Sequence, residues 1–317
     1  MPKQDDIRLS ITNQIIAALE SGNVPPWRRP WRLGKNAGAA ANVVSKRSYR
    51  GLNPILLDLA AQNHGFSSRW WGTFAQWKSL GGRVMKRPPH VPEGKWGTQI
   101  VFWSPVTKTV RNDQGDDEED RFFVLRLYTV FNVDQVEGSH LDHLRASQGE
   151  TGETAVIDYQ PAEQALEAAR IGMGISLRYG GGKAFYSPIS DYIQLPPKET
   201  FESPDEFYAT AFHEMTHATE HPSRLDWSRK NRDHAYALGE LIAELGGVYI
   251  CRELGVPSSE NLDNHTAYLA NWLRAMRSDP RFIFMASAQA SKAASYILAF
   301  SRQPEDVPEP DGELVTI

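Results

Sequence analysis

The stretch His213-Glu214-Met215-Thr216-His217 is the feature that most constrains what this chain folds into. On a helix, residues four apart lie on one face, so both imidazoles of this motif can reach a single metal ion. The ion would be Zn²⁺, and Glu214 would lie beside its open coordination position as a general base. The H-E-x-x-H spacing predicts metal ligands at His213 and His217 and a catalytic base at Glu214.

The residues before the motif predict the helix that it needs. Ser203 suits an N-cap, Pro204 suits the first helical position, and Asp205 and Glu206 place negative charge in the first turn. We therefore expect a helix that begins at Ser203-Pro204 and runs through the motif. The alternative is a chance occurrence around structural histidines, and a third metal ligand elsewhere in the chain would decide between the two interpretations.

A second helix, expected over residues 236–252, carries Glu240 and Glu244 on one face. Two neighbouring carboxylates on an otherwise apolar helix are costly unless positive charge compensates them, and a metal held by two histidines would do so. The alternative is a pair of solvated acids on an exposed face.

The E-x-x-x-E spacing of this second helix resembles that of the glutamate zincins, or gluzincins. The resemblance implies that Glu240 is the third metal ligand and that Glu244 accepts a hydrogen bond from a metal-bound histidine. The two roles could be reversed, because that family more often has Asp or Asn at the second position. Zn²⁺ is the expected cofactor, and Mn²⁺ or Co²⁺ can share such ligands.

Length and cysteine content limit the class of protein. A chain of 317 residues is longer than most single domains, so two domains are expected. No stretch predicts a transmembrane helix, and the first residues lack the layout of a secretory signal. Cys251 is the only cysteine, which excludes an internal disulfide and suits a reducing compartment. We predict a cytoplasmic protein with no membrane partner and with Cys251 buried as a small hydrophobic side chain.

Charge divides the chain into two unlike halves. Residues 1–110 hold 16 Lys and Arg against 5 Asp and Glu, whereas the remainder holds 18 against 34. Seven of the nine tryptophans also fall within residues 1–110. Basic residues interleaved with aromatic ones suit single-stranded nucleic acid, because cations follow the phosphates and rings stack on unpaired bases. The first half therefore predicts a module that binds single-stranded DNA.

The candidate DNA contacts are basic, aromatic or amide side chains in this first half. They are Trp27, Arg28, Arg29, Trp31, Lys46, Arg47, Tyr49, Arg50, Asn53, Lys78, Arg83 and Lys86. Large aromatic side chains in a small domain are usually core, so about half of the seven tryptophans are expected to be buried. Binding to duplex DNA is disfavoured, since the sequence has no helix-turn-helix pattern, zinc finger or basic zipper.

Hydrophobic spacing and turn residues predict an α+β protein with two domains. Helices are expected over residues 7–19, 54–63, 73–80, 161–171, 260–277 and 285–301, and strands over 98–103, 121–131, 175–179, 184–188 and 191–196, with an acidic hairpin turn at 112–120. We expect a small basic α/β domain that binds single-stranded DNA at residues 1–140 and a linker at 141–158. A zincin-like domain at 159–303 and a disordered tail at 304–317 complete the expected organisation.

Several longer motifs resemble those of one protein family. In the first half they are Pro26-Trp27, Pro30-Trp31, Tyr49-Arg50-Gly51-Leu52-Asn53, TFAQWKSLGGRV at 73–84 and GTQIVF at 97–102. In the second half they are AFYSP at 184–188, DYIQLP at 191–196, HEMTHAT at 213–219, Arg224-Leu225 and ELIAELG at 240–246. Together they resemble the ArdC-type antirestriction proteins of conjugative plasmids, which are related to the N-terminal part of TraC-type plasmid primases.

The resemblance implies a domain that binds single-stranded DNA, a zincin-like metallopeptidase domain, and protection of incoming plasmid DNA from restriction. A host restriction-enzyme subunit is then a candidate peptidase target. One alternative is a DNA-binding protein whose metal site is structural or vestigial, so that covering the DNA alone protects it. Another is a nuclease or other phosphoryl-transfer site, which is disfavoured because nucleases use carboxylate-rich, often two-metal sites.

Overall fold

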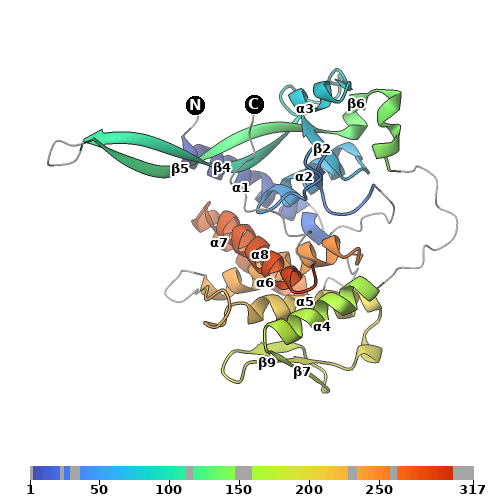
Figure 1. Ribbon diagram of the computed structural model, residues 1–317, viewed down its shortest axis with the longest axis vertical. Coiled ribbons are helices and arrows are strands. Elements are labelled where there is room, and N and C mark those ends of the chain that lie inside the picture. The colour runs from blue at the N-terminus through green and yellow to red at the C-terminus, as the bar shows by residue number, and fades with distance from the viewer. Residues whose placement is uncertain are drawn as a thin grey trace.

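The chain folds into an N-terminal α/β half stacked on a C-terminal half of helices and a small sheet (Figure 1). The computed structural model describes residues 3–21, 25–28, 36–111, 117–146, 159–227, 234–257 and 263–302. The α+β class predicted from the sequence is confirmed. None of the helices within those ranges is long and apolar enough to cross a membrane.

The N-terminal half is built on a four-stranded sheet with the strand order β1-β2-β5-β4. Its elements are α1 (Gln4–Ser21), the 3₁₀ helix η1 (Pro26–Arg28), β1 (Ala41–Asn42), α2 (Asn53–His64), β2 (Trp70–Thr73), α3 (Phe74–Ser79), β3 (Arg83–Val84), β4 (Thr98–Arg111), β5 (Asp117–Asn132), η2 (Val133–Gln135), β6 (Val136–Glu137) and η3 (Ser139–Leu144). β3 and β6 form a separate antiparallel pair. Thr73 and Gln76 form a capping box that begins α3, so the start predicted for this helix is confirmed.

β4 and β5 form a long antiparallel hairpin that projects from the body of the molecule (Figure 1). Because β5 already begins at Asp117, the acidic turn is shorter than the 112–120 expected, and residues 112–116 lie outside the described residues. Both faces of the hairpin carry apolar side chains, and Val101, Trp103, Phe123 and Leu125 share one of them. Val101 and Leu125 on that face are buried in the core, whereas Trp103 and Phe123, also on that face, are exposed.

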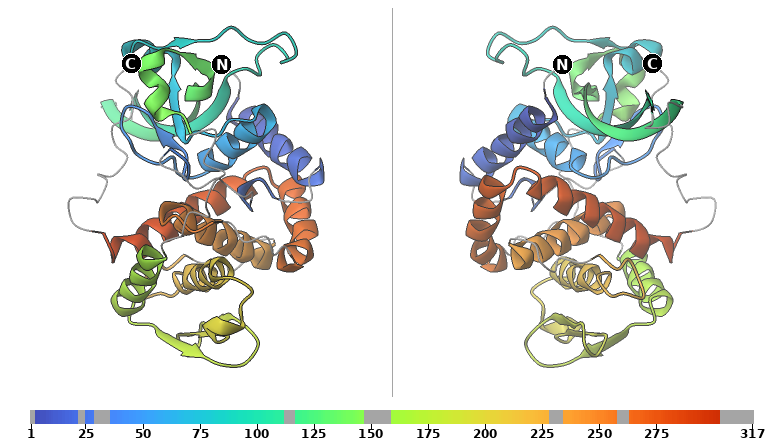
Figure 2. Two further views of the ribbon diagram at one scale, coloured as in Figure 1. Left: turned by 90° about the vertical axis from the view of Figure 1, so that its right-hand side faces the viewer. Right: turned by 90° about the vertical axis from the view of Figure 1, so that its left-hand side faces the viewer.

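The C-terminal half places a three-stranded sheet and α4 beneath a layer of helices (Figure 2). Its elements are α4 (Gln160–Gly172), β7 (Ser176–Tyr179), β8 (Phe185–Ser187), β9 (Tyr192–Leu195), η4 (Lys198–Thr200), α5 (Pro204–Ala218), α6 (Ala235–Glu253), α7 (Asp263–Ser278) and α8 (Phe282–Ala299). β9 lies in the middle of the sheet, parallel to β7 and antiparallel to β8. The helices and strands predicted here are confirmed to within a few residues.

One hydrophobic core runs through both halves. Ile11, Trp27 and Ile55 from the N-terminal half belong to the same buried cluster as Phe212 and Trp272 from the C-terminal half. Hydrogen bonds also cross between the halves: the Tyr249 hydroxyl donates to the Gly51 carbonyl at 2.9 Å, and the Gly51 amide donates to Ser291 Oγ at 2.7 Å. The N-terminal and C-terminal halves therefore share part of their interior.

The first part of the expected linker is folded. Leu141 and Leu144 on η3 are buried against Val133, Val136 and Trp77. The N-terminal half therefore extends at least to residue 144, because these two leucines supply apolar side chains to its core. Residues 147–158 and the expected tail at 304–317 lie outside the described residues.

Candidate functional site

The motif helix α5 begins as the sequence predicted. The Ser203 side chain accepts a hydrogen bond from the Glu206 amide at 3.3 Å, and Pro204 occupies the first turn. Phe207, Phe212 and Met215 are buried, which orients α5 in the core. The opposite side of the helix presents the histidines of the motif to α6.

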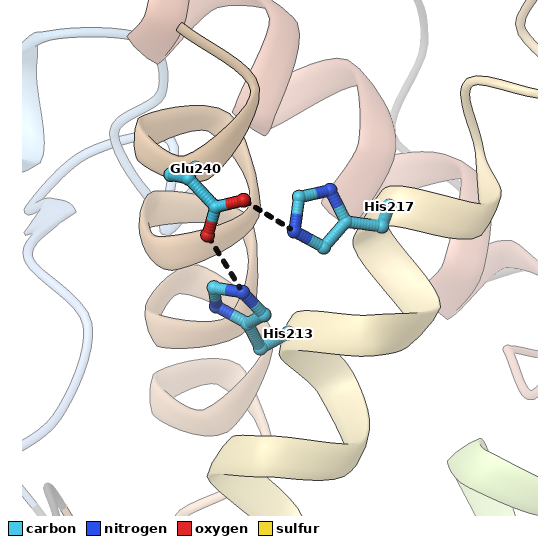
Figure 3. Close-up of side chains that lie close together, drawn as sticks. All are labelled: His213, His217 and Glu240. Atoms are coloured by element: carbon cyan, nitrogen blue, oxygen red, sulfur yellow. Dashed lines mark ion pairs between the residues drawn. The ribbon is translucent and has the colours of Figure 1, made fainter. Parts of the chain in front are cut away.

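His213 and His217 point toward Glu240 on α6 (Figure 3). Each histidine Nε2 lies 3.7 Å from a Glu240 carboxylate oxygen, His213 from Oε2 and His217 from Oε1. The two imidazole centroids are 4.9 Å apart. One ligand atom from each of the three residues lies within 4.8 Å of the others, so a single ion could contact all three.

This donor set fits a divalent metal. Imidazole nitrogens and a carboxylate oxygen at about 2.0–2.2 Å from a tetrahedral ion would lie about 3.3–3.6 Å from one another. Each histidine Nε2 is 3.7 Å from its nearest Glu240 oxygen and the whole set lies within 4.8 Å, so small side-chain shifts would close it around an ion. Two histidines and one glutamate also form the ligand set of one class of catalytic zinc site, which leaves a coordination position open. The geometry places Glu240, and not Glu244, between the two histidines.

The site concentrates negative charge around the histidines. Burial alone would lower the pKa of His213, but Glu240, Glu214 and Glu244 outweigh it and raise that pKa. Burial alone would also raise the pKa of Glu240, but the two histidines hold it far below its usual range. Glu240 therefore stays ionised, which is the state that a metal ligand requires.

Two glycines allow α5 and α6 to approach closely enough for this arrangement. A Cβ on Gly247 would lie 3.2 Å from the His213 amide nitrogen, and one on Gly246 would lie 2.5 Å from the Thr216 side chain. This pair was not among the residues predicted from the sequence. The signal was available, because two consecutive glycines inside a helix are costly and are retained where another backbone must come close.

Glu214 lies on α5 next to His213 and is mostly buried, with 8% of its surface exposed. Within the described ranges, no side chain or amide donates a hydrogen bond to its carboxylate. A carboxylate in this position can accept a proton from a molecule bound beside the histidines, as a general base must.

Glu244 occupies a different environment from the one expected. Its carboxylate accepts two hydrogen bonds from Arg28, from Nε at 2.5 Å and from Nη2 at 2.7 Å, and a third from Trp27 Nε1 at 3.2 Å. The expectation was an acceptor for a histidine N–H, and these donors from the N-terminal half were not foreseen. Glu244 still lines one small cavity together with His213.

Arg224 braces the end of α5. Its guanidinium forms a bidentate pair with Asp191 at 2.8 and 2.9 Å and donates to the Ala218 carbonyl at 2.8 Å. Asp191 lies in the turn before β9 and also accepts from the Tyr186 hydroxyl at 3.0 Å. Burial and the Asp191 carboxylate together raise the pKa of Tyr186 to about 12, so Tyr186 stays protonated in this brace.

Tyr268 also lies near the site and was not predicted from the sequence. Its hydroxyl lies 3.1 Å from that of Tyr236 on α6. The bond with Tyr236, burial and the charges of Glu240 and Glu214 all raise the pKa of Tyr268. Short polar pairs between helices leave no periodic signal in the sequence, which is why Tyr268 was not found.

Three of the predicted DNA contacts are buried, and those predictions are wrong. Trp27 is fully buried, Arg28 is bound to Glu244, and Asn53 exchanges hydrogen bonds of 2.8 and 2.9 Å with the backbone of Val101. Each has its polar atoms engaged inside the protein, so none can contact a nucleic acid in this conformation. Arg29 and Trp31 lie outside the described residues.

The other predicted contacts lie at or near the surface. Lys46, Arg47, Lys78, Arg83 and Lys86 are exposed, and Tyr49 and Arg50 are half-buried. The Lys46 ammonium lies 4.6 Å from the centroid of the Trp70 ring. Arg83 is paired with Glu137.

The tryptophans divide much as predicted. Among the six that the structure describes within residues 1–110, three are buried, two are half-buried and one, Trp103, is exposed. The predicted burial of Cys251 is also confirmed, and burial raises the pKa of its thiol to about 12.

Comparison with known proteins identifies both halves. Residues 5–131 match the family model of the N-terminal domain of anti-restriction factor ArdC, and residues 163–289 match that of a zincin-like metallopeptidase. The crystal structure of metal-free ArdC from plasmid R388 superposes with a TM-score of 0.73 at 34% identity, over 93% of this chain and 98% of that one. This chain belongs to the ArdC antirestriction family.

Other relatives extend the ArdC comparison. The Mn(II)-bound structure of the R388 protein matches with a TM-score of 0.68 over 93% of this chain and 97% of that one, also at 34% identity. The uncharacterized protein y4eC of Sinorhizobium fredii is 34% identical over 93% of this chain and 92% of its own length. DNA primase TraC of Escherichia coli is 32% identical over 92% of this chain, which spans only 27% of TraC.

Proposed function

We propose that this chain binds a divalent metal at His213, His217 and Glu240 and uses it to hydrolyse a peptide bond. The observation that supports the proposal is the convergence of these three side chains from α5 and α6, within 4.8 Å of one another. The zincin-like family model over residues 163–289 agrees with it. Zn²⁺ is the metal that this ligand set suits, and the Mn(II)-bound relative makes Mn²⁺ the second candidate.

Each residue of the proposed site has a separate role. A bound divalent ion supplies Lewis acidity, which polarises a carbonyl group and makes water more acidic. Glu214 accepts a proton at its carboxylate and can return it to the leaving amine. Glu240 and the two histidines hold the ion, and Arg224 with Asp191 fixes the end of the helix that carries the histidines.

Replacement of His217 by alanine tests the metal site directly. We expect Mn²⁺ and Zn²⁺ affinity to fall by more than about 100-fold, because even residues that only orient metal ligands contribute about 10–100-fold. Isothermal titration calorimetry of metal-free protein measures the effect. His221→Ala is the matched control, since His221 lies four residues after His217, beyond the end of α5, and bonds Ser223 instead. A His217→Ala variant that binds metal as the wild type does would exclude this ligand set.

We also propose that the N-terminal half binds single-stranded DNA on its exposed cations and aromatic rings. Trp103 and Phe123 lie on one face of the β4–β5 hairpin with 47% and 64% of their surface exposed. The Arg8 guanidinium lies 5.4 Å from the centroid of the Trp103 ring, so a cation borders this face. Exposed rings of this kind can stack on unpaired bases, and nearby cations can contact the phosphates.

We expect Trp103→Ala to weaken binding of a labelled oligonucleotide by about 1–3 kcal/mol, the typical contribution of one stacked base. Lys78→Gln should instead lower the dependence of log affinity on log salt concentration by about one unit, if Lys78 contacts a phosphate. Fluorescence anisotropy at several salt concentrations separates the two effects. Ile189→Ala is the control, because Ile189 is an exposed apolar residue in the C-terminal half. Equal losses in all three variants would contradict a localised DNA surface.

The biological role we propose is protection of incoming plasmid DNA from restriction in the cytoplasm. DNA held beside the metal site would bring a restriction enzyme on the same DNA within reach of it, so such subunits are the candidate substrate. In the second candidate function the metal site has no hydrolytic role and DNA coverage alone protects. The buried pair between Glu244 and Arg28 is compatible with both functions. A Glu214→Gln variant distinguishes them, because only the peptidase function needs the Glu214 carboxylate.

A further inference from the structure

The N-terminal half reaches the metal centre through the single turn η1. Trp27 and Arg28 on this turn are buried against α6, and both donate hydrogen bonds to Glu244. The Trp27 ring also packs against Trp272, at a centroid distance of 6.1 Å. The Trp27 carbonyl accepts from Arg252 Nη2 at 2.8 Å, which fixes the turn to α6 at a second point.

Glu244 connects this turn to the metal ligands. It lies one helical turn after Glu240 on α6, so a shift of the α6 backbone at this turn moves both side chains together. Glu244 also lines one small cavity with Arg28 and His213. Glu244 is thus in contact with the N-terminal half on one side and close to a histidine of the site on the other.

Stability alone does not explain a buried pair of this kind. Taking an arginine and a glutamate out of water costs about as much as their attraction returns, and well-packed apolar side chains often stabilise a protein equally well. A bidentate pair does fix geometry, because two parallel hydrogen bonds hold both partners in one orientation. The Arg28–Glu244 pair therefore suits a positioning role.

We infer that Arg28, supported by Trp27, is a positioning residue of the metal centre: by holding Glu244 it sets the position at which α6 presents Glu240 to the histidines. The N-terminal half is then a part of the metal site rather than a separate DNA-binding attachment. This inference rests on the proposed metal site. If wild-type protein binds neither Mn²⁺ nor Zn²⁺, the proposed function fails before the role of Arg28 is in question.

The same helix offers a matched control. Arg252, two turns beyond Glu244, pairs with Asp58 of α2 and forms a second ion pair between the two halves. Burial, opposed by Arg252, raises the pKa of Asp58, so this pair also lies in a desolvated environment. Asp58→Asn removes this ion pair but keeps the hydrogen bond from Arg252 to the Trp27 carbonyl and both hydrogen bonds from Arg28 to Glu244.

The experiment is a Mn²⁺ titration of metal-free full-length protein, with thermal unfolding measured for each variant. Arg28→Gln is expected to weaken Mn²⁺ binding by about 10–100-fold, the usual effect of removing a group that orients a metal ligand. Asp58→Asn is expected to lower the unfolding temperature and to leave Mn²⁺ affinity at the wild-type value. Equal Mn²⁺ affinity in these two variants, at similar losses of thermal stability, would overturn the inference.

Two further variants test the route through Glu244. Once Glu244→Gln has removed the charged acceptor, adding Arg28→Gln should cause little further loss of Mn²⁺ affinity, whereas independent effects would multiply and contradict the inference. Arg28→Lys keeps the charge but not the bidentate geometry, so it should lie between wild type and Arg28→Gln. If Arg28→Gln does not fold, the lysine variant decides: Mn²⁺ affinity below that of Asp58→Asn supports the inference, and equal affinity overturns it.

Discussion

Replacing Glu214 by glutamine is expected to lower peptide hydrolysis by about 10²–10⁴-fold, the usual contribution of a general base. The substitution keeps the size of a side chain that is only 8% exposed, and it removes the proton acceptor. Because Glu214 is not one of the three clustered ligands, Mn²⁺ affinity should stay near that of the wild type. Loss of turnover with retained metal would assign the base to Glu214.

The measurement combines cleavage of an unfolded protein substrate with Mn²⁺ titration of the same preparation. Glu220→Gln is the control, since Glu220 lies just beyond the end of α5 and outside the ligand cluster. Undiminished hydrolysis in the Glu214 variant would rule out the proposed base. A separate conjugation assay then addresses biology: full protection of plasmid DNA by this variant would show that coverage of the DNA is sufficient.

Trp27→Ala is expected to lower the free energy of unfolding by about 3–5 kcal/mol, the typical cost of removing a large buried aromatic side chain. Trp27 is fully buried in the core that both halves share, and its indole N–H bonds Glu244. Both halves should therefore lose stability together. Urea unfolding followed by circular dichroism and by tryptophan fluorescence measures this, with coincident transitions expected from the two probes.

Trp103→Ala is the matched control for Trp27→Ala. Trp103 is 47% exposed on the β4–β5 hairpin, so its removal should leave the free energy of unfolding almost unchanged. The two substitutions are thus expected to differ: Trp27→Ala lowers stability, whereas Trp103→Ala lowers DNA affinity. A two-step transition in Trp27→Ala, with the C-terminal half unfolding at the wild-type urea concentration, would contradict a shared core.

The helices and the three clustered ligand residues could be predicted from the sequence because their signals are local. Ser203, Pro204 and Glu206 mark the start of α5, and the spacing of His213 and His217 is set by the helix itself. Glu240 required one further step, a second helix with acids on one face. Spacing of this kind can be interpreted without knowing the fold, since it depends only on helix geometry.

The roles of Trp27 and Arg28 could not be predicted in the same way. In the sequence, an arginine beside a tryptophan on a DNA-binding surface cannot be distinguished from the same pair in a core. The deciding partner, Glu244, is 216 residues from Arg28 along the chain. Aromatic and basic content therefore predicted a surface where the structure has a desolvated ion pair. The same limit applies to Tyr236 and Tyr268, which meet only when α6 and α7 pack.

The shared interior has a consequence for how such a protein can change over time. In this core α1 packs against α7 and η1 packs against α6, so each half constrains which substitutions the other tolerates. Exchange of one half for that of a distant relative would bring together surfaces that had not adapted to each other. Recombination should therefore conserve the pair as one inherited unit, with exchange points falling outside it.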